Sequence, residues 1–150
     1  MTIGLLESLP LLEARLNPAF LSSPYEAQCR REAARHGAHY DLVLCDKQIL
    51  PETLPFTCDL LLVPGDAVFT PFLECQLLLT GGMNGEDAVS FSSIGEDSAM
   101  LCLQRELRFC GKDIFPFEKP IFFDRNFSLY KNLATGFALS LAELLFGEDV

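Results

Sequence analysis

The sequence has no glycine-rich motif that would mark a nucleotide-binding enzyme. A phosphate loop needs a lysine and a hydroxyl residue beside its glycines, whereas the only Gly-Lys pair here, Gly111-Lys112, runs into Asp113. A dinucleotide fingerprint needs three glycines between a first strand and its helix, and only Gly4 lies in that region. These absences argue against binding of ATP or a dinucleotide, and we expect no cofactor.

Patterns for nucleophilic or metal chemistry are also absent. The chain has no Gly-x-Ser-x-Gly elbow, and its two histidines, His36 and His39, form no Cys-His pair at ligand spacing. The cysteines are scattered without a Cys-x-x-Cys pair, which favours reduced structural thiols over a zinc site. They are Cys29, Cys45, Cys58, Cys75, Cys102 and Cys110. We therefore expect no metal and no catalytic residue, and the absences favour a protein that is not an enzyme.

Positive charge is scarce. The 11 lysines and arginines against 21 aspartates and glutamates give a formal net charge of −10, whereas a binder of phosphate backbones needs a positive face. No basic segment precedes the first apolar residues, and no uninterrupted apolar run reaches the roughly 18 residues of a membrane-spanning helix. We expect a cytoplasmic, acidic protein with no nucleic-acid partner and no membrane association.

Four apolar runs predict strands near residues 2–7, 41–46, 59–64 and 76–80. The runs do not alternate and are bounded by turn residues, as is typical of strands buried on both faces of a largely parallel sheet. With 150 residues and 49% hydrophobic content, the chain is long enough for one domain, which we place over residues 1–150.

Helices and a hairpin complete the predicted fold. A capping box from Ser23 to Glu26 predicts a helix near 24–36, and apolar residues at steps of three and four predict a long helix near 127–146. Alternation of polar and apolar residues predicts an antiparallel hairpin near 88–109. The expected fold class is α/β, a short Rossmann-like, mostly parallel sheet extended by the hairpin and flanked by helices, including the long C-terminal helix.

Aspartates and glycines follow the ends of three predicted strands. Asp46 follows one strand, Gly65 and Asp66 follow the next, and Gly81 and Gly82 follow another. In open α/β sheets, ligands bind beyond the carboxyl ends of the strands, so we expect these residues to form a ligand-binding crevice. The alternative is that aspartate and glycine end strands simply because they favour turns.

Arg105 interrupts the apolar face of the predicted hairpin. Leu103 and Leu107 flank it at the two-residue spacing of one strand face. Either its guanidinium points to the core side and needs a carboxylate or carbonyl partner, or a bulge or strand end lets it reach solvent. As a functional residue it would hold an anionic ligand, so it joins the residues expected to bind a ligand.

The stretch LLLTGGMNGEDAVSFSSI, residues 77–94, resembles the end of the central domain of Mur ligases. In that family a buried strand leads through a Thr-x-Gly motif and an aspartate-containing loop into an alternating strand. The resemblance implies a Rossmann-like sheet followed by a hairpin. The phosphate loop and catalytic lysine of the family have no counterpart here, so the resemblance carries over no activity and no residue role.

Two functions fit these observations. The first is a non-catalytic interaction or assembly protein that binds a protein partner or forms a homo-oligomer. The aromatic segment IFPFEKPIFF, residues 114–123, is the exposed edge expected to make such contacts. The second is a small polar-ligand binder or enzyme that uses the crevice at the carboxyl ends of the parallel strands.

Overall fold

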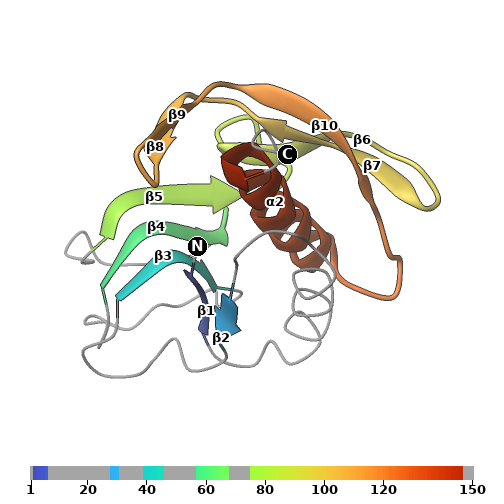
Figure 1. Ribbon diagram of the computed structural model, residues 1–150. Coiled ribbons are helices and arrows are strands. Elements are labelled where there is room, and N and C mark those ends of the chain that lie inside the picture. The colour runs from blue at the N-terminus through green and yellow to red at the C-terminus, as the bar shows by residue number, and fades with distance from the viewer. Residues whose placement is uncertain (1, 7–27, 31–38, 46–56, 68–74, 147–150) are drawn as a thin grey trace.

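The computed structural model describes residues 2–6, 28–30, 39–45, 57–67 and 75–146. Within these parts the chain forms ten strands and one helix (Figure 1). The elements are β1 (Thr2–Leu6), β2 (Gln28–Arg30), β3 (His39–Cys45), β4 (Thr57–Pro64), β5 (Cys75–Gly81), β6 (Val89–Ile94), β7 (Ser98–Leu103), β8 (Leu107–Phe109), β9 (Lys112–Ile114), β10 (Phe117–Phe122) and α2 (Leu129–Phe146).

Eight of these strands form one mixed sheet in the order β10-β7-β6-β5-β4-β3-β1-β2. The pairing is parallel from β2 to β6 and antiparallel from β6 through β7 to β10. β8 and β9 form a separate two-stranded hairpin. The large sheet curls, and α2 packs against β5, β6, β7 and β10 inside the curl (Figure 1).

The prediction of a Rossmann-like α/β fold is wrong. The described residues are mostly strand, and they form a curled mixed sheet with a C-terminal helix instead of a parallel sheet flanked by helices. Part of the helix predicted near 24–36 is also wrong, because Gln28–Arg30 forms β2 and pairs with β1. A capping residue stabilises a helix by about 1 kcal/mol, and pairing with the sheet outweighs that local preference. The rest of this segment lies outside the described residues.

Other local predictions are confirmed. The four apolar runs are strands β1, β3, β4 and β5, and the helix predicted near 127–146 is α2. The hairpin predicted near 88–109 exists as β6 and β7, but β7 ends at Leu103. Leu107–Phe109, which was expected to continue the same strand, forms β8 and pairs with β9.

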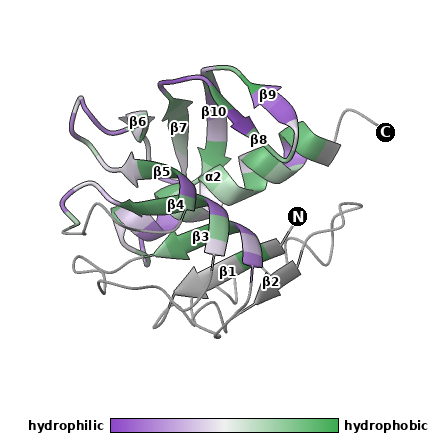
Figure 2. Cartoon of the chain, turned by 90° about the vertical axis from the view of Figure 1, so that its left-hand side faces the viewer, coloured by the Kyte–Doolittle hydropathy of each residue, from purple (hydrophilic) through white to green (hydrophobic). Residues whose placement is uncertain are grey.

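The parallel half of the sheet (β1 to β5) and the antiparallel half (β6, β7 and β10) differ in how far their faces are buried. In β3 and β4 both faces are buried, because Leu42 and Leu62 belong to the cluster around α2 while Val43 and Leu61 belong to a second cluster. This explains why these strands read as continuous apolar runs, and Figure 2 shows hydrophobic stretches along β3, β4 and α2. In β6, the end that begins at Ser92 is exposed, so the antiparallel half presents polar surface to solvent.

Candidate functional site

β4 and β5 end side by side at a structural joint. The Gly65 N–H donates to the Gly81 carbonyl at 2.9 Å, and the Gly82 N–H donates to the Val89 carbonyl at 3.0 Å. β5 pairs parallel with β6 through the single register pair of Gly81 and Val89, and β6 pairs antiparallel with β7 from Val89 onward. The glycines therefore mark the place where parallel pairing gives way to antiparallel pairing.

The carboxylate of Asp87 fills the space between these strand ends. Asp87 is 4% exposed, and its Oδ2 accepts a hydrogen bond from the Asn84 N–H at 3.0 Å. A Cβ added at Gly82 would lie 2.6 Å from Oδ2, and one added at Gly65 would also collide with the carboxylate. Asp87 was not among the residues expected to bind a ligand. The spacing Asn84-x-x-Asp87, typical of a turn closed by an aspartate side chain, is the signal that marks it.

Gly81 faces the opposite side of the sheet, where α2 packs. A Cβ at Gly81 would lie 2.7 Å from Cδ2 of Leu133 and 3.4 Å from the ring of Tyr130. The Tyr130 hydroxyl donates to the Leu62 carbonyl at 3.1 Å and fixes the helix over β4. The absence of a side chain at Gly81 is therefore what allows α2 to approach the end of β5.

The predicted crevice residues thus have different surroundings. Gly65, Gly81 and Gly82 lie together, but side chains occupy the space next to each of them. Asp87 lies beside Gly65 and Gly82, and Leu133 lies beside Gly81 on the other face. Asp66 is exposed in the turn after β4, and Asp46 lies outside the described residues. Binding of a ligand by these residues stays a prediction.

A hollow of about 440 Å³ lies beside Asp87. It is lined by Thr80 in β5, by Glu86, and by Gln104 and Arg105, which follow β7. Arg105 is exposed at a bend between β7 and β8, so the strand break that lets it reach solvent is the arrangement observed. The hollow brings Arg105 near the end of β5, and its polar lining fits a small polar ligand better than an apolar one.

One group of side chains at the start of β3 and β4 could hold a divalent cation. The ligand atoms of His39, Asp41 and Asp59 all lie within 4.8 Å of one another. Nε2 of His39 is 3.2 Å from Oδ1 of Asp59, and its Nδ1 is 2.6 Å from the Thr57 hydroxyl. The sequence prediction of no metal site rested on spacing along the chain, and this grouping arises only from strand register. His39 is 54% exposed in this arrangement, as an ordinary surface ion pair would be.

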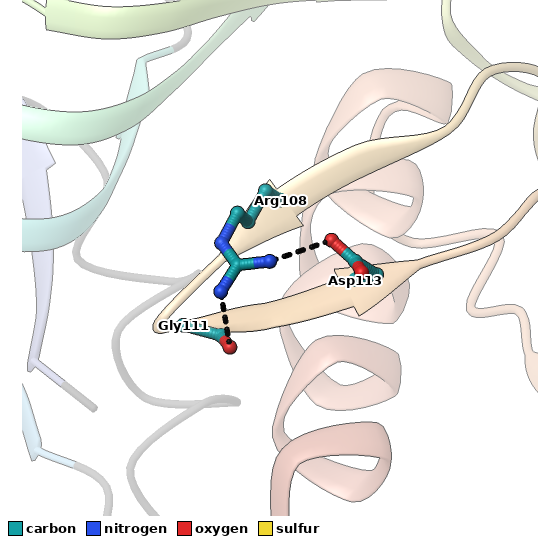
Figure 3. A network of polar contacts seen from close by, with 3 residues as sticks. All are labelled: Arg108, Gly111 and Asp113. Carbon is teal, nitrogen blue, oxygen red and sulfur yellow. Dashed lines mark hydrogen bonds and ion pairs between the residues drawn. The ribbon is translucent and has the colours of Figure 1, made fainter.

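The Gly111-Lys112 pair lies in the turn of the β8–β9 hairpin. Gly111 has a φ of 75°, and its carbonyl accepts a hydrogen bond from Arg108, which also pairs with Asp113 at 3.0 Å (Figure 3). The Lys112 ammonium donates to the Leu144 carbonyl near the end of α2 at 2.7 Å, where a cation is favoured by the helix dipole. This pair therefore serves hairpin and helix packing.

β10 is a free edge of the large sheet in the described part of the chain. This confirms the edge position for residues 117–122 of the aromatic segment 114–123, whereas Ile114 belongs to β9 and is buried. Phe122 within β10 is 65% exposed, and Phe115 before it is 64% exposed. An ion pair between Lys119 and Glu143 connects β10 to α2. Among the described strands, β10 has β7 on one side and no strand on the other.

Comparisons with protein-family models, with curated proteins and with solved structures find no match for this chain. The resemblance of residues 77–94 to Mur ligases therefore stays a prediction. In the described residues, no helix combines the length and hydropathy needed to cross a membrane.

Proposed function

We propose that this chain is a non-catalytic, cytoplasmic assembly domain that pairs with a second copy of itself along β10. The observation that carries the proposal is that β10 ends the sheet among the described strands, with the side chain of Phe122 65% exposed upon it. Unpaired strand edges template pairing with another chain, and exposed aromatic side chains add apolar contact area. The filling of the strand-end crevice by Asp87 favours this function over ligand binding at the glycines.

The outward-facing backbone groups of β10 follow from its hydrogen bonds. The Phe123 N–H donates inward to the Asp97 carbonyl at 2.9 Å. Because inward and outward groups alternate along an antiparallel strand, Glu118, Pro120 and Phe122 direct their backbone groups outward. Proline fits such a position, since it has no N–H to lose from the ladder.

In the proposed dimer, the β10 strands of two copies pair antiparallel about a twofold axis at Pro120, so that their outward backbone groups face each other. Glu118 of one copy then lies opposite Phe122 of the other, so the outward backbone groups of Glu118 face the partner strand at both ends of the pair. The two Pro120 residues lie opposite each other, so no donor is left unpaired at the centre. The two Glu118 carboxylates stay apart, which limits repulsion between copies of an acidic chain.

The test is light scattering of the wild type and of two matched variants across a concentration series. The wild type is expected to form a dimer at high concentration. Phe122→Ser should weaken the dimer at least about tenfold, which corresponds to about 1.4 kcal/mol. Phe115→Ser is the control, because Phe115 is equally exposed but lies outside β10. A wild type that stays monomeric, or equal effects of both substitutions, would contradict the proposal.

The hollow beside Arg105 supports a second candidate function, binding of a small anionic ligand. Its lining includes the cationic Arg105 together with Thr80 and Gln104, whose side-chain amide also donates to the Ser90 hydroxyl at 2.9 Å. Thermal unfolding with inorganic phosphate or succinate should show a rise in melting temperature that Arg105→Ala removes. Arg108→Ala is the control, since Arg108 is also exposed but pairs with Asp113 within the hairpin. No rise in the wild type, or a rise in all three proteins, would exclude this site for these anions.

A further inference from the structure

Cys58 and Cys75 lie side by side at the start of β4 and β5. They are register partners on these parallel strands, and Cys75 packs against the buried cluster that contains Cys58. Neighbouring strands lie about 4.8 Å apart, and a disulfide needs a Cα separation of about 4.4 to 6.8 Å. Two cysteines on the same face at this separation can be joined with little backbone movement.

The two thiols already interact. The hydrogen bond from the Cys58 thiol lowers the pKa of Cys75 to about 7, although burial opposes this shift. The same hydrogen bond, followed by burial, raises the pKa of Cys58. Cys58 is 2% exposed, whereas Cys75 is only partly buried. The accessible member of the pair is therefore the one that more readily becomes a thiolate, which is the nucleophilic form.

Other described cysteines differ in their surroundings. Cys45 and Cys102 are buried, and the Cys102 thiol donates to a Glu118 carboxylate oxygen at 3.3 Å. Cys110 is exposed in the β8–β9 turn, and partial burial together with the nearby charge of Asp41 raises its pKa to about 11. These residues provide internal controls for the pair.

We propose that Cys58 and Cys75 form a redox-active dithiol, in which a peroxide oxidises Cys75 and Cys58 then closes a disulfide between β4 and β5. This inference is independent of the proposed dimer. It extends the expectation of reduced thiols, since Cys58 and Cys75 are both present as thiols and not as a disulfide in this structure.

The reaction balances in two steps. The Cys75 thiolate attacks one peroxide oxygen, so an S–O bond forms, the O–O bond breaks and the departing hydroxide is protonated to water. The Cys58 sulfur then attacks the Cys75 sulfenic acid, an S–S bond forms, the S–O bond breaks, and the hydroxide leaves with the Cys58 proton as a second water. The dithiol loses two electrons and hydrogen peroxide gains them. A small dithiol such as dithiothreitol reverses the reaction by thiol–disulfide exchange.

The first test treats the full-length wild type with hydrogen peroxide and maps disulfide-linked peptides by mass spectrometry. We expect a Cys58–Cys75 link that dithiothreitol removes. In Cys58→Ser, dimedone should trap the Cys75 sulfenic acid, whereas Cys75→Ser should leave Cys58 reduced. Cys102→Ser should form the same link as the wild type. A wild type in which Cys58 and Cys75 remain as reduced as Cys45 would overturn the proposal.

A second measurement uses only the wild type, so it does not depend on the folding of any variant. Iodoacetamide should label Cys75 at least about tenfold faster than Cys110 at neutral pH, because its larger thiolate fraction outweighs its lower intrinsic nucleophilicity. The labelling rate of Cys75 should level off above pH 7, and that of Cys110 should keep rising. Equal rates at neutral pH would contradict the assignment of Cys75 as the attacking thiol.

Discussion

The parallel and antiparallel halves of the sheet use their surfaces in different ways. Strands β3 and β4 are buried on both faces, and β5 joins them under α2. Strands β6, β7 and β10 pack one face against α2, and β10 ends the sheet among the described strands. The parallel half therefore resembles a core element, and the antiparallel half provides surface for contacts.

This difference assigns separate roles to the two regions. A strand buried on both faces gains stability from every residue, so its side chains are constrained by packing. A strand with one exposed face and a free edge can change its outward side chains at little cost to stability. The proposed assembly surface lies in the second region and the proposed dithiol in the first, and the glycine joint lies where the two regions meet.

The largest expected effects come from truncating residues on the two faces of each half. Leu61→Ala and Leu62→Ala, on opposite faces of β4, should each lower the free energy of unfolding by about 2 to 5 kcal/mol, since both residues are 0% exposed. In β7, Leu101→Ala should cost a similar amount, while Met100→Ala, on the other face, should cost less than about 1 kcal/mol. Urea denaturation measures all four. If Leu61→Ala costs no more than Met100→Ala, β4 does not have two equally buried faces.

A smaller effect is expected at the joint between the halves. Gly82→Ala should lower the free energy of unfolding by about 1 to 3 kcal/mol, because the new Cβ meets the Asp87 carboxylate. Gly85→Ala is the matched control and should change stability by less than about 0.5 kcal/mol, since nothing lies within 4 Å of its added Cβ. The penalty at Gly82 should shrink in an Asp87→Ala background. An undiminished penalty there would mean that Asp87 is not what excludes the side chain.

The smallest effect concerns Cys110 in the β8–β9 turn, near the start of the parallel half. Partial burial, and then the charge of Asp41, raises its pKa from 9.0 to about 11. Because the folded chain keeps this proton to higher pH than the unfolded chain, the contribution to stability is present below pH 9 and is lost as the pH rises to about 11. Solvent screening of an exposed thiol limits the change to below about 1 kcal/mol. Cys110→Ser should lose less stability than the wild type over that range in urea unfolding. An identical loss would show that the folded chain does not raise the pKa of Cys110.

The sequence predicts buried faces better than strand partners. The apolar pattern of Leu101, Leu103 and Leu107 is correct, since all three side chains are buried. Yet Leu107 does not belong to β7. The chain bends at Arg105, and the residues from Leu107 onward form β8, which pairs with β9. Periodicity reports which face is covered, but the choice of partner depends on register and on distant parts of the chain.

The same limit applies to the functional residues. Glycines at strand ends were evident, but the sequence did not reveal that Asp87 would occupy the space beside them. Cys58 and Cys75 are 17 positions apart (75 minus 58), and only the parallel register of β4 and β5 brings them together. The edge position was predictable because Pro120 in β10, and Pro116 just before it, disfavour a central strand.

Hydrogen exchange at the β10 backbone tests the proposed assembly most directly. The amide of Glu118 is directed outward and should exchange fast in a dilute solution, whereas the amide of Ile121, bonded toward β7, should be protected at every concentration. In a concentrated wild-type solution, we predict that protection appears at Glu118 and that Phe122→Ser abolishes it there. Fast exchange at the Glu118 amide at every concentration would contradict pairing through β10.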